Sequence, residues 1–252
     1  MKKKEMNNSP IIFERIKELN KRFENIAKEL QANQEVFKMP SEIKDSLSKI
    51  GKGLIRVYTE TPDNLLNISK FGWFLDLDCE MKYSFELNDL IENDKYDEAE
   101  KSLVNYYSNN LTEIFEVLSK RHPIRKEILS QIEKSYNEEL FYLTIPVVLS
   151  QIDGICNDIT TKKFFIKNKE YLPEVYPIIE KMHSSMTDIF LAPIKNSSPL
   201  NVWEKKIGDF PLKLNRHEIL HGVDINYGNK INSLKCISLL KYISDLIIRI
   251  DR

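Results

Sequence analysis

The segment LNRHEILHG, residues 214–222, gathers the side chains of this chain that are best suited to chemistry. Two of the four histidines, His217 and His221, lie four residues apart here, beside Arg216 and Glu218. Histidine exchanges protons near neutral pH, and the arginine guanidinium carries a permanent charge in a geometry that matches phosphate oxygens. The same few residues allow two chemistries, one with a metal ion and one without.

The metal-dependent interpretation rests on the HExxH pattern from His217 to His221. On a helix the two imidazoles share one face and can bind Zn²⁺, while Glu218 acts as general base on a metal-bound water. Such a site needs a third ligand, but after Gly222 the sequence contains no further His or Glu. Asp224 follows His221 by three residues, beyond a turn. A zinc metallopeptidase is therefore one alternative, and its third ligand is not evident.

The metal-independent interpretation rests on Arg216 and His221, which are separated by four residues. Cleavage of RNA by its own 2′-hydroxyl needs a base, a cation at the crowded phosphate and an acid for the leaving oxygen. Arg216 supplies the cation and His221 one proton-transfer group. A symmetric dimer would supply the second proton-transfer group from the other copy. This chemistry requires no metal and no other cofactor.

The segment NRHEILHG resembles the Rx4–6H motif of the HEPN superfamily, in which the residue after the arginine is usually Asn, Asp or His. That residue is His217 in this chain. Residues 223–235 are similar to the turn and last helix of prokaryotic HEPN-like proteins, many of them associated with defence. The runs GWF at 72–74 and FYLTIPVVLSQIDGI at 141–155 are similar to the same pattern.

The resemblance implies an all-α helical bundle that forms a homodimer and acts as a metal-independent endoribonuclease on RNA. Arg216 and His221 would be the catalytic pair, and His217 would shape the site. Family members often serve as toxins or antiviral effectors, so an antitoxin or defence partner protein is a further expectation. Other members have lost catalysis, and a silent scaffold that binds RNA or protein is the second alternative. The carboxylate of Glu218 is not required by the motif and would weaken phosphate binding.

Two neighbours of the motif are candidates for substrate binding. Asn215 precedes the arginine and is a candidate for substrate binding. It either caps the helix or positions Arg216, or merely faces water, and exposure to water is the preferred interpretation. Tyr227 lies in the following turn, where it either lines the site or packs the turn. The other histidines, His122 and His183, are isolated in sequence, and we expect them to be surface or packing residues.

The charge balance at first argues against RNA, because 37 Lys and Arg nearly cancel 38 Asp and Glu. Residues 160–252, however, hold 15 basic and 10 acidic residues, a net of +5, which leaves 22 and 28, a net of −6, in residues 1–159. Within the basic part, residues 162–169 (KKFFIKNK) combine lysines with Phe164 and Phe165, as single-strand binders do. The preferred interpretation of this run is a solvated linker with a hydrophobic anchor.

The elements that must position the motif are helices. Only 7 glycines occur in 252 residues, which argues against turn-rich β folds and phosphate-cradling glycine loops. We expect an all-α protein with a helical N-terminal extension over residues 1–83 and a HEPN-like helical domain over residues 84–252. The expected helices cover residues 9–37, a start at 41, a start at 61, 85–93, 96–120, 123–142, a core helix from 146, 173–191, a short helix near 203, 211–221 and 230–248. Loops are expected at 51–53 and 193–199, and a buried connector at 70–83.

Cysteine use and hydropathy bear on location. The three cysteines are widely separated, which fits a reducing interior. The basic start MKKKEMNNSP has no apolar run behind it, unlike a signal peptide. The longest uncharged stretch in the middle of the chain is residues 140–152, which is shorter than the roughly 20 residues of a membrane-spanning helix. We therefore expect a soluble, cytoplasmic protein that does not associate with a membrane.

Overall fold

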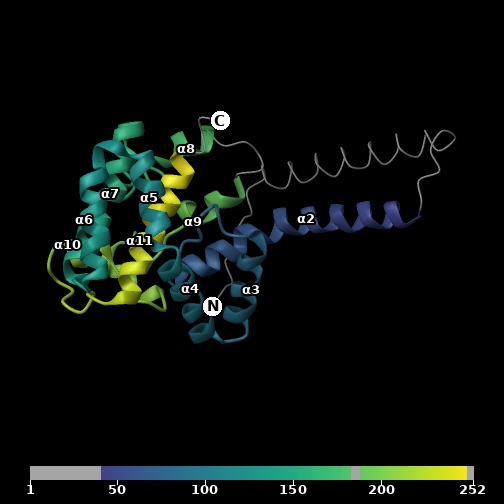
Figure 1. Cartoon of the computed structure of the whole chain (residues 1–252), viewed down its shortest axis with the longest axis horizontal. Coiled ribbons are helices and arrows are strands. Elements are labelled where there is room, and N and C mark those ends of the chain that lie inside the picture. The colour runs from purple at the N-terminus through teal and green to yellow at the C-terminus, as the bar shows by residue number, and fades with distance from the viewer. Residues whose placement is uncertain (1–40, 183–187, 249–252) are drawn as a thin grey trace. The chain divides into compact units, whose positions relative to one another are not determined.

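The computed structural model describes residues 41–182 and 188–248, and within these ranges the protein is all-α (Figure 1). No strand forms in the described residues, where Lys167 and Pro173 make an isolated β-bridge. The prediction of an all-α protein is confirmed. None of the described helices is long and apolar enough to cross a membrane. The helix expected at residues 9–37 lies outside the described residues.

Contacts divide the chain into two units, residues 1–55 and 56–252. The candidate site and the hydrophobic core formed by the described residues lie in the second unit. The boundary expected after residue 83 stays a prediction. The α-helices, with the labels of Figure 1, are α2 (Ser41–Lys70), α3 (Met81–Glu92), α4 (Tyr96–Asn109), α5 (Leu111–Arg121), α6 (Lys126–Asn137), α7 (Phe141–Thr160), α8 (Tyr176–Met182), α9 (Ala192–Lys195), α10 (Arg216–Leu220) and α11 (Lys230–Ile248). Short 3₁₀ helices occupy Pro123–Arg125, Asp188–Leu191 and Glu204–Asp209.

Helix α2 differs from the sequence prediction in two places. It continues through Gly51 and Gly53, where a loop was expected, and through Pro62, where a new helix was expected to begin. Glycine lowers helix stability by only about 1 kcal/mol relative to alanine, so it does not by itself end a helix. Around Pro62, Thr61 and Leu65 are buried, and their packing favours continued helix despite the lost amide hydrogen bond.

Other expected helices divide or shorten. Asn110 separates α4 from α5, and Glu139, at φ 59°, separates α6 from α7. The connector before α3 is buried as expected, with Trp73 and Phe74 inside the core. The helix expected at 211–221 is only the five residues of α10. The expected loop at 193–199 contains α9, and the expected helix at 173–191 appears as α8 and the 3₁₀ turn at Asp188–Leu191, with 183–187 outside the described residues.

Helix α11 is the central element, and its predicted bounds, Lys230 and Ile248, are confirmed. It packs against α4, α5 and α7, and in Figure 1 it runs in yellow beside α5. The sequence shows one apolar stripe on this helix, yet every residue from 232 to 247 is buried. Its polar faces are paired instead. Ser238 Oγ accepts the amide of Phe74 at 3.2 Å, and Ser244 Oγ bonds His122 Nε2 at 2.8 Å.

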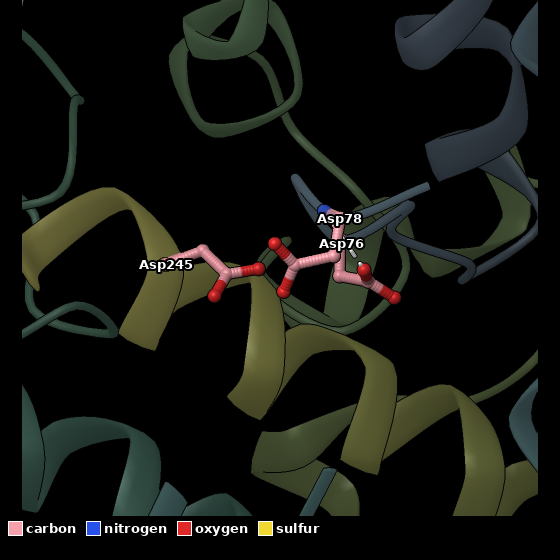
Figure 2. Close-up of side chains that lie close together, drawn as sticks. All are labelled: Asp76, Asp78 and Asp245. Carbon is pink, nitrogen blue, oxygen red and sulfur yellow. Dashed lines mark hydrogen bonds between the residues drawn. The ribbon is translucent and has the colours of Figure 1, made fainter. Parts of the chain in front are cut away.

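Three carboxylates, those of Asp76, Asp78 and Asp245, converge beside α11 (Figure 2). The ammonium group of Lys241 lies among them, 2.7 Å from Asp78 and 2.8 Å from Asp245. Arg121 pairs with Asp245 as well, and Asp245 accepts the amide of Leu77 at 3.0 Å. Burial raises the pKa of the Asp76 carboxyl above its ordinary value. Two of the protein's own cations, Lys241 and Arg121, thus lie against these three carboxylates, and the ion pairs tie the 71–80 connector to α11.

Candidate functional site

Asn215 holds the motif in place from within the protein. Its side chain is 0% exposed, and its Oδ1 accepts the amides of His217 at 2.9 Å and Glu218 at 3.3 Å, which caps α10. Its Nδ2 donates to the carbonyls of Pro199 and Val202 at 3.0 and 2.9 Å. The preferred interpretation that Asn215 faces water is therefore wrong, because the side chain is buried and its oxygen and amide group are used to cap α10 and to bond the carbonyls of Pro199 and Val202.

Arg216 is half-buried at the first position of α10. Its guanidinium carbon lies 4.8 Å from the centre of the Phe165 ring, and its Nη2 lies 3.8 Å from Asp153 Oδ2. Its Nε is buried and has no hydrogen-bond acceptor among the described residues. The guanidinium is therefore held by a ring and a carboxylate, and one of its donors remains unused.

Asp153 links three segments around Arg216. It lies on α7, and its Oδ1 accepts the amides of Phe164 and Phe165 at 3.0 and 2.9 Å. Phe164 is fully buried, as expected for a hydrophobic anchor, while Phe165 is half-buried against Arg216. The basic run at 162–169 is thus fixed to α7 and brought next to the motif.

The two histidines of the motif are close neighbours. The rings of His217 and His221 lie 4.3 Å apart, edge to face, and both side chains are exposed. His221 ends α10, and Gly222, at φ 71°, takes the left-handed conformation that commonly follows a helix. The spacing of four residues therefore places the two imidazoles side by side, as expected for one helix face.

An open pocket of about 620 Å³ lies beside α10 and contains part of the predicted site. We call it the Arg216 pocket. Its wall includes the polar side chains Lys167, Asn201, Lys206, Arg216 and His217, and the aromatic side chains Phe165, Tyr171 and Trp203. Arg216 and His217 thus come together with two lysines, whereas His221 is outside the wall, next to His217.

Several residues of this pocket were not singled out as site residues from the sequence. They come from two segments of the chain. Tyr171 follows the basic run, and Asn201, Trp203 and Lys206 belong to the segment that ends in the 3₁₀ helix Glu204–Asp209 before the motif. The one sequence signal was the basic and aromatic character of 162–169, which contributes Phe165 and Lys167. Burial lowers the pKa of the Lys167 ammonium to about 8.

Tyr227 packs the turn that follows α10. Its ring meets that of Tyr142 edge to face at 5.1 Å, and its hydroxyl donates to the Tyr142 carbonyl at 3.2 Å. Its own carbonyl accepts from Asn232 Nδ2 at 2.9 Å. Tyr227 is half-buried and is not part of the pocket wall. These contacts tie the turn to α7 and to the start of α11.

The zinc alternative needs a third metal ligand beside His217 and His221. Within residues 41–182 and 188–248, the structure brings together one group of three potential ligands, the aspartates of Figure 2, and that group does not include His217 or His221. The Asp224 carboxylate accepts the amide of Asn226 at 2.8 Å, within its own turn. Glu218 lies 3.6 Å from Lys213. The described residues thus offer two imidazoles and no third ligand beside them.

Exposed apolar side chains occur on α7 and α10 and on the segments next to them. Helix α10 packs on α7, and large apolar side chains are exposed on both sides of this contact. They are Leu140, Tyr142, Leu143 and Val147 before and on α7, and Leu220, Val223 and Ile225 on α10 and the segment after it. We call these seven residues the α7–α10 surface. Exposed apolar patches of this kind are typical of protein–protein contacts.

Comparisons of the chain with family models, with curated proteins and with solved structures gave no match.

Proposed function

We propose that this protein is a metal-independent endoribonuclease of the HEPN type, which cleaves RNA by attack of its own 2′-hydroxyl group. The observation that carries this proposal is the pocket in which Arg216 and His217 lie together with Lys167 and Lys206. The three cations are groups that bind a phosphate, and His221, next to His217, is a group that moves a proton at it. The pocket belongs to the part of the chain with a net charge of +5.

Each residue of the motif has a distinct role in this proposal. Arg216 binds the scissile phosphate and stabilises the charge that grows on its oxygens during attack. His221 exchanges the proton, and His217, whose ring lies 4.3 Å away, orients His221 and closes the edge of the pocket. Asn215 positions α10 so that Arg216 and His217 enter the same wall.

A homodimer is the second part of the proposal. One Arg216–His221 set offers one proton-transfer group where the reaction needs two. The α7–α10 surface lies next to His221 and is the apolar area that a second copy would cover. Its seven residues are exposed on or next to two helices that are packed together, and an isologous contact would pair this area with the same area of the second copy.

Incubation of the purified protein with mixed RNA, including tRNA, in EDTA tests the ribonuclease. We expect cleavage that is lost in Arg216→Ala and in His221→Ala, and products with 2′,3′-cyclic phosphate ends. Glu218→Gln separates the two enzymatic alternatives, since the ribonuclease tolerates it and a zinc peptidase does not. Absence of cleavage, with RNA binding that His221→Ala leaves unchanged, would support the silent scaffold instead.

The dimer is tested by light scattering on the wild type and on Leu143→Glu. A charge in the α7–α10 surface should give monomers and remove cleavage while the fold, followed by circular dichroism, is retained.

The toxin or antiviral role, with an antitoxin or defence partner, is tested by expression in bacteria. Growth arrest by the wild type and growth with Arg216→Ala is the expected result.

A further inference from the structure

Two aromatic side chains of the Arg216 pocket are unusually exposed. Trp203 is 57% exposed and Tyr171 is 85% exposed, whereas the other tryptophan, Trp73, is fully buried in the core. Exposed aromatic rings on a pocket wall that also carries cations are the features with which proteins bind unpaired nucleobases. Neither ring has a role in the phosphate chemistry assigned to Arg216 and His221.

The position of Trp203 suits stacking from one side. The ammonium group of Lys205 lies 4.8 Å from the centre of its ring, so one face of the indole is covered by a cation. A cation–π contact of this kind restrains the ring and leaves its opposite face for a planar ligand. The next residue, Lys206, belongs to the pocket wall.

The same wall contains two hydrogen-bond donors without acceptors among the described residues, Arg216 Nε and Asn201 Nδ2. The orientation of the Asn201 amide follows from its neighbour, because its Oδ1 accepts the amide of Ser198 at 2.9 Å. Its nitrogen is therefore the unused atom. Both atoms are buried, so they are not exposed to a ligand in the pocket, and the proposal rests on the exposed rings and the cations of the wall.

We propose that the Arg216 pocket binds one unpaired nucleotide of a single-stranded RNA, with its base stacked on Trp203 and its phosphate held by Arg216 and Lys206. The inference rests on the proposed function for its ligand, RNA, and adds the form in which that RNA binds. In a duplex the faces of each base are covered by its neighbours, so stacking on Trp203 requires an unpaired base.

Intrinsic fluorescence offers a direct test. The chain has two tryptophans, of which Trp73 is buried and Trp203 is exposed. A base that stacks on the exposed indole should therefore quench the fluorescence of Trp203 and leave that of Trp73 unchanged. The probe is a 2′-O-methyl decanucleotide of non-self-complementary sequence, which has no free 2′-hydroxyl and is not cleaved. We expect quenching by this single strand and none by its duplex with a complementary strand. Equal quenching by both forms would overturn the proposal.

Variants separate stacking from charge. With a labelled decanucleotide, Trp203→Phe should bind within about three-fold of the wild type and lose the quenching signal, while Trp203→Ala should bind at least about ten-fold more weakly. Lys206→Ala should weaken binding and reduce its salt dependence by about one ion. Lys126→Ala is the matched control, since it removes an exposed lysine of α6 outside the pocket. Wild-type affinity in Trp203→Ala contradicts the proposal.

The two proposals fail in distinguishable ways. Quenching by the uncleavable single strand, together with intact natural RNA after incubation, would support the subsite and reject the ribonuclease. Cleavage of natural RNA without quenching, and without an effect of Trp203→Ala, would support the ribonuclease and reject the subsite.

Discussion

The guanidinium of Arg216 lies 3.8 Å from the carboxylate of Asp153, so the cation of the candidate site is shared with an acidic residue of α7. Asp153 also fixes the backbone of Phe164 and Phe165. It therefore has two effects of opposite sign. It orders the wall of the Arg216 pocket, and it places a negative charge where the proposal puts a phosphate.

Asp153→Asn should separate these two effects. The amide oxygen can still accept both backbone amides, while the charge beside Arg216 disappears. We expect binding of a single-stranded oligonucleotide to tighten about three-fold at low salt, because repulsion of the phosphate is removed. Asp153→Ala, by contrast, should lower the free energy of unfolding by about 1–2 kcal/mol through the lost hydrogen bonds. Fluorescence polarisation and urea unfolding measure the two results. Weaker binding in Asp153→Asn would mean that the ion pair is needed to orient Arg216.

Asn215→Ala should destabilise the protein by about 2–4 kcal/mol. It removes the cap of α10, which contributes about 1 kcal/mol, and leaves the carbonyls of Pro199 and Val202 without their donor. Asn215→Asp should not rescue stability, because a carboxylate keeps the cap but has no hydrogen to donate to those carbonyls. Urea unfolding measures the change. A loss below 0.5 kcal/mol in both variants would contradict the positioning role.

Lys241→Met should be strongly destabilising, by about 3–5 kcal/mol, because it leaves the buried carboxylates of Asp245 and Asp76 without the cation between them. The matched control is Lys82→Met, which breaks an exposed ion pair with Glu86 on α3 and should change stability by less than about 1 kcal/mol. Thermal unfolding of the two variants checks the contrast. Similar effects of both substitutions would be inconsistent with a stabilising role of Lys241 among the three aspartates drawn in Figure 2.

His122 should make stability depend on pH. Burial, with the nearby charges of Arg121 and Arg125, lowers the pKa of its imidazole to about 4 from the ordinary 6.5. The unfolded chain therefore binds a proton between these values and the folded protein does not. Stability contributed by neutral His122 is complete above pH 6.5 and is lost as the pH falls towards 4, by up to about 3 kcal/mol. His122→Gln, which can keep the bond to Ser244, should flatten this part of the profile. An unchanged profile would exclude His122 as its source.

Lys167 should make RNA binding weaken as the pH rises above neutral. Its pKa is lowered to about 8 by burial, so its charge is present at neutral pH and is lost as the pH rises through 8. Binding of the uncleavable decanucleotide should therefore weaken between pH 7 and 9. In Lys167→Arg the loss should disappear, because arginine stays charged in this range. The wild type and Lys167→Arg share the other charged or titratable groups of the wall, which are Lys206, Arg216 and His217. Equal pH dependence in both proteins would rule out Lys167.

The sequence by itself determined the helical class of this protein, the bounds of its central helix and the placement of the two neighbouring histidines. The spacing of apolar residues predicts α11 with its bounds, and the helix signals along the chain, together with the scarcity of glycine, predict an all-α protein. The spacing of His217 and His221 is enough to place their rings together on one turn of helix. These properties depend on hydrogen bonds and side-chain contacts within a few residues, which a helix imposes wherever it forms.

Only the tertiary structure decided which distant segments meet. Trp203, Lys206 and Tyr171 join Arg216 because Asn215 ties α10 to the loop at 199–202 and Asp153 ties the basic run to α7. Tertiary contacts also join the acidic and basic parts of the sequence. The buried Lys235 and Lys241 of the basic part form ion pairs with Glu100 and Asp78 of the acidic part. Long-range contacts of this kind come from the packing of a whole core, in which each buried polar group must find its partner elsewhere in the chain.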